Sequence, residues 1–295
     1  MNFGGRAAVA ACGVVLGSFG VAATGWANDS LINTEYFYLE IEGGYAFSDG
    51  LESTRAPLRP VEPDGGFYGT VTLGHEDPET GIVWGYVDRA EIWVSYFDHG
   101  DDQQSGNVGS AAVPIAGSYF AEREYWEIGT RFQHYFEEPA ADKYSQPSTS
   151  NILLGIEPFY GRFDEESVEV TGAVVTPAEL DTDIFGAMLS LEGEWDIAPS
   201  TTFLGRAAVG GYFGDADYTS PAFNLSDDFG GFRGQLAIGL QQHLSESISL
   251  AVMGRLDYFS AVGDIDGPAA APILGNDDLL VLTIGANINF KFNAN

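Results

Sequence analysis

Alternation of apolar and polar residues with a period of two is the feature that most constrains the fold of this chain. The clearest run lies near the C-terminus, where apolar residues occupy every second position: Leu280, Leu282, Ile284, Ala286, Ile288, Phe290 and Phe292. This pattern is typical of β-strands, whose successive side chains point to opposite faces. No segment after residue 27 has 18 consecutive apolar residues or keeps the 3.6-residue period of a helix. The sequence therefore predicts an all-β protein.

Ten alternating runs follow residue 27, and each is long enough for the roughly 9–11 tilted residues that cross a bilayer as a strand. They are 35–48, 66–76, 84–98, 119–136, 151–163, 183–196, 201–213, 229–244, 247–260 and 279–292. Aromatic residues gather near the run ends, as in Tyr96-Phe97, Tyr212-Phe213 and Tyr258-Phe259. Aromatic girdles at two membrane interfaces explain this placement, whereas a soluble β-sandwich has no need of them.

The connections between the runs alternate in length. The longer ones are about 49–65, 99–118, 164–182, 214–228 and 261–278, and the others are 77–83, 137–150, 197–200 and 245–246. Of the second set, all but 137–150 are short. Outer-membrane barrels have long loops outside and short turns on the periplasmic side. The sequence predicts a transmembrane antiparallel up-and-down β-barrel of about ten strands with this arrangement, and a soluble all-β domain is the alternative.

The first 27 residues predict a cleaved signal peptide, and 28–295 a single barrel domain. Arg6 is the one charge, an apolar run follows to about Ala23, and Gly25 and Ala27 are the small residues before the cleavage site. The run is short for a transmembrane anchor. Lipoprotein processing at Cys12 would leave about five apolar residues after Arg6, fewer than a signal peptide needs. Cys12 is the single cysteine, so the exported chain forms no disulfide.

Net charge limits the partners. Without Arg6, 11 basic residues face 43 acidic ones, a formal charge of −32. Such a chain is repelled by nucleic acid, so no nucleic-acid partner is expected. It is not disordered, because 45% of the residues are apolar and 13% aromatic. The acidic residues must therefore be segregated from the apolar surface.

The signal peptide, the glycine- and aromatic-rich body and the final Asn-Ile-Asn-Phe-Lys-Phe of 287–292 resemble the outer-membrane β-barrel superfamily of small porin-like proteins. The resemblance spans 28–295 as a pattern, is generic, and assigns no substrate. It implies a place in the outer membrane of a Gram-negative bacterium, among lipid and lipopolysaccharide. It also implies recognition of Ile288, Phe290 and Phe292 by the barrel-assembly machinery, although Asn293, Ala294 and Asn295 follow the last Phe. A monomer is expected.

Strand parity places a ladder of charged residues inside the barrel. It comprises Glu40, Glu42, Arg89, Glu91, Arg123, Glu127, Arg131, Glu157, Glu192, Glu194, Arg206, Arg233, Arg255 and Asp257. Arg–carboxylate pairs could brace the barrel, or a charged constriction could form a narrow, cation-preferring pore. Ten strands enclose a backbone radius of roughly 10 Å, whereas open channels have about 16–18 strands. Bracing is the favoured interpretation.

The outer connections hold most of the acidic residues. Spaced carboxylates beside Gly suit Ca²⁺ or Mg²⁺, which prefer several hard oxygen ligands, and the candidate ligands are Asp98, Asp101, Asp102, Asp215, Asp217, Asp264 and Asp266. None of these completes an EF-hand loop. Simple solvation of exposed loops is the favoured interpretation, and cations that bridge the loops to lipopolysaccharide are the alternative. No other cofactor is expected.

Some enzymes, including omptin proteases and certain lipid A-modifying enzymes, are small outer-membrane barrels. An omptin-like site here would combine His99 with Asp98, Asp101 or Asp102 and an Asp from another loop. No motif supports such a site, because there is no nucleophile elbow and acidic pairs are abundant by composition. We predict a non-enzymatic barrel with a structural or surface role, or a narrow pore for small solutes. An outer-membrane hydrolase is the alternative.

Overall fold

The computed structural model describes residues 35–48, 65–78, 80–83, 85–98, 102–107, 116–136, 150–171, 173–262 and 276–293. The predicted signal peptide, residues 1–27, lies outside these ranges. The described residues include no helix that is long and apolar enough to span a membrane.

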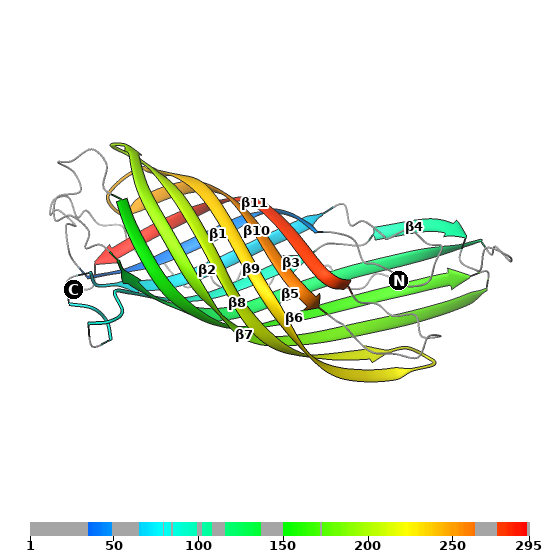
Figure 1. Cartoon of the computed structure of the whole chain (residues 1–295). Helices are drawn as coiled ribbons and strands as arrows, with labels where there is room; N and C mark the ends of the chain where they lie inside the picture. The colour runs from blue at the N-terminus through cyan, green and yellow to red at the C-terminus, as the bar shows by residue number, and fades with distance from the viewer. Residues whose placement is uncertain are drawn as a thin grey trace. The chain divides into compact units, whose positions relative to one another are not determined.

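Eleven strands in the described residues form one antiparallel sheet that closes on itself (Figure 1). They are β1 (Tyr36–Ser48), β2 (Gly66–Glu76), β3 (Arg89–Asp98), β4 (Asp102–Asn107), β5 (Ala116–Tyr135), β6 (Ser150–Thr171), β7 (Val174–Ala198), β8 (Thr201–Thr219), β9 (Asn224–His243), β10 (Ile248–Val262) and β11 (Asn276–Asn293). Sequential strands are neighbours, β1 pairs with β11, and β3 pairs with β5. The short β4 pairs with the outer part of β5. Ten strands thus form the barrel wall, which confirms the predicted fold.

Two of the predicted outer loops are instead strands. β6 continues to Thr171 and β7 begins at Val174, so most of 164–182 is paired. β8 continues to Thr219 and β9 begins at Asn224, so most of 214–228 is paired as well. The predicted loop bounds are wrong there because both strand pairs continue beyond the last apolar residues. The alternation persists in these extensions, but carboxylates occupy outward positions that were apolar in the membrane. Two smaller differences concern β3 and β4. Residues 102–107, which were predicted to be part of a loop, form β4, and β3 begins at Arg89 rather than at residue 84.

The outer rim of the barrel is uneven. Figure 1 shows β5 and the β6–β7 and β8–β9 hairpins extending past β10, β11 and β1–β3 at the end opposite the C-terminus. β9 pairs with β10 as far as Arg233, and its residues 224–232 have no strand partner on that side in the described structure. The two hairpins and β5 therefore form a tall part of the wall, and β10, β11 and β1–β3 a lower part.

The two faces of the wall have the inverse polarity of a soluble protein. Large apolar side chains on the outer face are exposed, such as Leu189 (66%), Ile238 (63%) and Val252 (62%). Charged side chains on the inner face are buried, such as Glu157 (0%) and Arg123 (2%). A barrel in lipid requires this arrangement, whereas a soluble sandwich buries its apolar face. The ten strands therefore cross a membrane.

A ring of carboxylates marks the outer limit of the apolar band. These residues lie on the lipid-facing side of seven strands, just beyond its last apolar or aromatic side chains, and we call them the acidic ring: Asp98, Glu124, Asp164, Asp183, Asp215, Asp228 and Asp278. Asp98 pairs in register with Glu124, and Asp183 with Asp215, so the ring follows neighbouring strands. Its position indicates where the hydrocarbon ends and the headgroup region begins.

The candidate functional site in the barrel lumen

All fourteen residues of the predicted charge ladder lie on the inner face of the strands. Two more carboxylates join them, Glu76 at the end of β2 and Glu165 on the outer part of β6. Sequence reasoning missed Glu165 because 164–182 was interpreted as a loop. Parity would have found it, since Glu165 follows the inward Glu157, Phe159 and Phe163 at even spacing.

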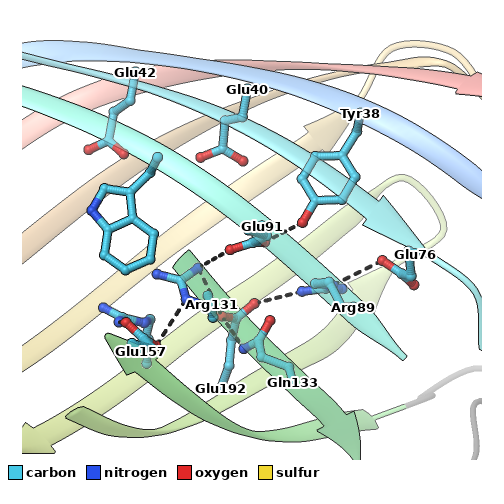
Figure 2. A network of polar contacts seen from close by, with 12 residues as sticks. Tyr38, Glu40, Glu42, Glu76, Arg89, Glu91, Arg131, Gln133, Glu157 and Glu192 are labelled. Carbon is cyan, nitrogen blue, oxygen red and sulfur yellow. Dashed lines mark hydrogen bonds and ion pairs between the residues drawn. The ribbon is translucent and has the colours of Figure 1, made fainter. Parts of the chain in front are cut away.

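Arg89 organises the network nearest the periplasmic end of the barrel. Its guanidinium lies 2.9 Å from Glu76 and 3.0 Å from both Glu192 and Glu194. Figure 2 shows Arg89 between Glu76 and Glu192. Because β5 and β6 separate β3 from β7, these contacts reach across part of the lumen rather than between adjacent strands. Each carboxylate in this group therefore has a positive partner.

A second network surrounds Glu157, whose side chain is fully buried. Arg131 contacts Glu157 at 2.9 Å and Glu91 at 2.6 Å, and Arg206 forms a further ion pair with Glu157. Tyr38 donates a hydrogen bond to Glu91. Figure 2 shows Arg131 between Glu91 and Glu157. A buried charge needs such partners, because it has lost its hydration.

Arg233 forms the bridge that crosses the lumen most completely. It extends from β9 to form an ion pair with Glu127 on β5, and it contacts Asp257 on β10 at 3.2 Å. Three strands lie between β5 and β9 along the wall. The Arg233 guanidinium carbon is also 4.7 Å from the ring centre of Phe159 and 4.5 Å from that of Phe259. A charged group that contacts two aromatic rings thus reaches across the bore.

Aromatic side chains fill the lumen beside Arg233, and we call them the aromatic plug: Tyr125, Phe159, Phe163, Tyr212 and Phe259. None of the five is more than 8% exposed. Ring centres are 4.2 Å apart for Tyr125 and Phe163 and 5.5 Å apart for Phe163 and Phe259. The sequence predicts that such residues form girdles at the membrane interfaces. In Tyr212-Phe213, however, Tyr212 is buried and Phe213 is exposed, so each pair contributes to both faces.

Beyond the plug, Arg123 and Glu165 form a buried ion pair at 2.6 Å, with side chains 2% and 3% exposed. A separate, half-exposed cluster lies on the outer surface, where Arg162 contacts Asp164 at 2.6 Å and Asp181 at 2.9 Å. These groups stand outside the apolar band. Burial and the hydrogen bond with Asp164 raise the pKa of Asp181, and Arg162 opposes this effect. The hydrogen bond to Asp164 raises the pKa of Arg162.

Among the described residues, the other predicted sites are not brought together into a cluster. Asp98, Asp215 and Asp217 face outward on their strands, and Asp102 begins β4. His99, Asp101, Asp264 and Asp266 lie outside the described residues. Within the described ranges, no group of three or more His, Cys, Asp or Glu is placed to hold a metal ion. Ile288, Phe290 and Phe292 share the outward face of β11, and their role in assembly stays a prediction.

Comparison with known proteins identifies the fold. No protein-family model and no curated protein sequence matches the chain. Among solved structures, it is similar to the outer membrane protease OmpT from Escherichia coli, with 7% identity, a TM-score of 0.50, and coverage of 90% of this chain and 99% of OmpT. The translocator domain of the autotransporter NalP from Neisseria meningitidis has 11% identity and a TM-score of 0.47, and the match covers 97% of this chain and 98% of that domain.

The chain is therefore an outer-membrane β-barrel protein, and its place is the bacterial outer membrane. Its lipid-facing apolar band, its closed ring of ten strands and its likeness to a solved barrel agree on this point. An identity of 7% conveys the fold and says nothing of activity.

Proposed function

We propose that this protein is a closed barrel with a structural or surface role, and that it neither conducts solutes nor catalyses a reaction. The observation that carries the proposal is the Arg233–Glu127 bridge across the lumen, whose guanidinium carbon lies 4.7 Å from the ring centre of Phe159 and 4.5 Å from that of Phe259. A solute that passed this level would have to separate a buried ion pair, which is costly because the charges have few other partners.

The extracellular hairpins support a surface role. The β6–β7 hairpin projects beyond the acidic ring, and its tip exposes Val174 (64%) and Val175 (59%). Such apolar residues at the end of a projecting strand pair are suited to contact with another molecule. The barrel would then serve as the anchor that holds this hairpin outside the membrane.

A hydrolase is the alternative, and OmpT is a protease by name. We do not propose that activity here, because Asp98, one of the described members of the predicted His99 site, faces outward from β3 rather than into the barrel mouth. Incubation of the purified barrel with peptides and with lipid A would test this choice. Turnover that is lost in an Asp98→Asn or His99→Ala variant would overturn it.

Because the lumen is closed, we predict that the protein carries no ion current across a bilayer. In planar lipid bilayers, the folded wild-type protein is expected to give no conductance steps above the baseline, because Arg233 and the aromatic plug fill the bore. An open porin in the same bilayers serves as the positive control. Reproducible cation-selective steps from the wild type would replace our proposal with the narrow-pore interpretation.

The surface role predicts that the hairpin tip is dispensable for folding. Residues 167–178 can be replaced by an Asn-Gly turn, because Glu166 and Glu179 face each other in register. The variant is expected to keep heat-modifiable gel migration and to lose adhesion of barrel-displaying cells to surfaces that the wild type binds. A Val174→Ser, Val175→Ser variant is the milder control. Equal adhesion by wild type and turn variant would contradict a role for this hairpin.

A further inference from the structure

The outer part of β9 is a strand edge. β9 pairs with β8 from Asn224 to Gln242, but its pairing with β10 ends at Arg233. Successive residues of a strand direct their backbone groups to alternate sides. The Phe232 N–H group donates a hydrogen bond to Ser260 Oγ of β10 at 2.8 Å, so the backbone groups of residues 224, 226, 228 and 230 point to the same side. Within the described ranges no strand pairs with them there, over about 20 Å at roughly 3.3 Å per residue.

The point where β10 leaves β9 is defined by specific contacts. The Ser260 carbonyl accepts a hydrogen bond from the Tyr212 hydroxyl of β8, in addition to the contact of Ser260 Oγ with Phe232. The next residue, Ala261, has a φ of 57°, a left-handed conformation that residues with a Cβ atom rarely adopt. β10 then continues beside β11 to Val262. These contacts mark the end of the β9–β10 pairing, and they leave the outer part of β9 as an edge.

Most of this edge lies outside the hydrocarbon. Asp228 belongs to the acidic ring, so residues 224–228 lie in the headgroup region or in water. Backbone groups can be hydrated there, whereas lipid would leave them unsatisfied. A water-soluble partner can therefore reach them. An exposed strand edge is a template for pairing with another extended chain.

The inner side of the wall next to the edge is apolar. Leu225 and Phe229 point inward from β9 and pack against a buried cluster that comprises Ala121, Leu180, Ala216 and Tyr218. A strand added at the edge would place every second side chain beside Leu225 and Phe229. Apolar side chains suit these positions, because they would extend the buried cluster.

The outer side of the wall next to the edge is acidic. The extended parts of β6 to β9 direct eight carboxylates outward, namely Asp164, Glu166, Glu179, Asp181, Asp183, Asp215, Asp217 and Asp228. Among the described residues of this surface, Arg162 is the one basic side chain, and it contacts Asp164 and Asp181. Asp228 lies on β9 itself, in register with Asp215 of β8, so the negative charge reaches the edge. Basic side chains of an added strand would be attracted to this side.

We propose that the outer edge of β9 binds an extended basic segment of another protein by β-strand addition. The backbone of that segment pairs with residues 224–230. Its side chains alternate between apolar ones toward the inner cluster and basic ones toward the acidic outer side. A second copy of this chain fits poorly, because its own edge carries Asp228 and like charges oppose pairing. The interaction goes beyond the role proposed for the β6–β7 tip, since it uses a different strand, and it requires no conduction.

Fluorescence anisotropy of a labelled peptide tests the edge. The probe is a seven-residue peptide in which Lys and Val alternate, added to the full folded barrel in a nonionic detergent. The wild type is expected to show saturable binding that weakens at higher ionic strength, because salt screens the attraction. A peptide with Glu in place of Lys has the same backbone and is expected not to bind.

Two variants of Ser226 test the backbone pairing. Ser226→Pro removes an N–H group that points to the edge and places the proline ring there, whereas the pairing with β8 does not use that group. Binding of the Lys–Val peptide is expected to weaken about tenfold or more, because a hydrogen bond is lost and the ring obstructs the added strand. Ser226→Ala also loses the hydroxyl but keeps the N–H group, so it should bind as the wild type does.

A second pair of variants tests the charge. A double variant, Asp215→Asn with Asp228→Asn, is expected to weaken binding about threefold or more, in line with exposed ion pairs. Glu246→Gln removes an exposed carboxylate from the turn between β9 and β10, at the opposite end of β9, and should leave binding unchanged.

Three results would overturn the proposal. Equal binding by Ser226→Pro and Ser226→Ala would show that charge alone holds the peptide, and a wild type without saturable binding would leave no peptide site. Self-association of the barrel that Ser226→Pro abolishes would assign the edge to a second copy. If Ser226→Pro fails to fold, a fully N-methylated peptide decides: it is expected to lose binding, and undiminished binding would refute strand addition. The variant that lacks 167–178 keeps β9 and should still bind the peptide, so this test is separate from that of the hairpin tip.

Discussion

Arg233→Ala is expected to lower the free energy of unfolding by about 3–5 kcal/mol, the loss typical when one partner of a buried ion pair is removed. The substitution leaves Glu127 and Asp257 in the lumen without their guanidinium, and it also removes the cation that contacts the rings of Phe159 and Phe259. Urea titration of the barrel in lipid vesicles, followed by tryptophan fluorescence, measures the change.

Two comparisons make the Arg233 result specific. Arg162→Ala, on the half-exposed outer cluster, is expected to cost about 1 kcal/mol or less, because solvent screens such pairs. A triple variant, Arg233→Met with Glu127→Gln and Asp257→Asn, removes the charges together and should recover much of the loss. Equal losses for Arg233→Ala and Arg162→Ala would mean that the lumen bridge does not stabilise the barrel.

The second large effect concerns the aromatic plug. Phe163→Ala and Phe259→Ala are each expected to cost about 3–5 kcal/mol, because the removed rings are 1% and 2% exposed and a cavity replaces them. Together they should also let ions through, since they remove two of the five rings that fill the bore. The double variant is therefore expected to show conductance steps in planar bilayers, where the wild type is silent.

Phe213→Ala is the control for the plug, because Phe213 follows the buried Tyr212 but is 78% exposed on the lipid-facing side. Its loss should be smaller and should leave the bilayer current at baseline. A silent double variant that remains folded would show that the ion-pair networks alone close the lumen, and the plug would then be a stabilising core only.

Strand positions could be predicted from the sequence because a barrel repeats one simple rule, alternation with a period of two. The same parity places Glu157 and Arg206 inside and Leu189 outside, in agreement with their burial. The rule failed where lipid ends: at Asp164 and Asp215 the outward residue becomes acidic, and the strand was interpreted as a loop. Apolar alternation therefore identifies only the part of a strand that faces lipid, and a strand can continue beyond the membrane.

The ion-pair partners could not be predicted from the sequence. Arg233 meets Glu127 because β5 and β9 face each other across the closed barrel, and closure depends on β3 pairing with β5 while β4 lies outside the ring. Nothing in a linear pattern specifies which strands lie opposite. The aromatic plug could not be predicted either. Adjacent aromatic residues such as Tyr212 and Phe213 point to opposite faces of the wall, and the sequence pattern alone does not show which inward rings meet in the lumen.

The acidic ring fixes how deeply the protein sits in the bilayer. If the barrel sank by two residues along each strand, carboxylates on seven strands, among them Asp183 and Asp215, would enter hydrocarbon at once. If it rose by the same amount, exposed apolar residues such as Phe185 and Phe213 would meet water. The two penalties act in opposite directions over a few ångströms. The barrel is thereby held at one height, and the tall hairpins present their tips at a constant distance above the membrane.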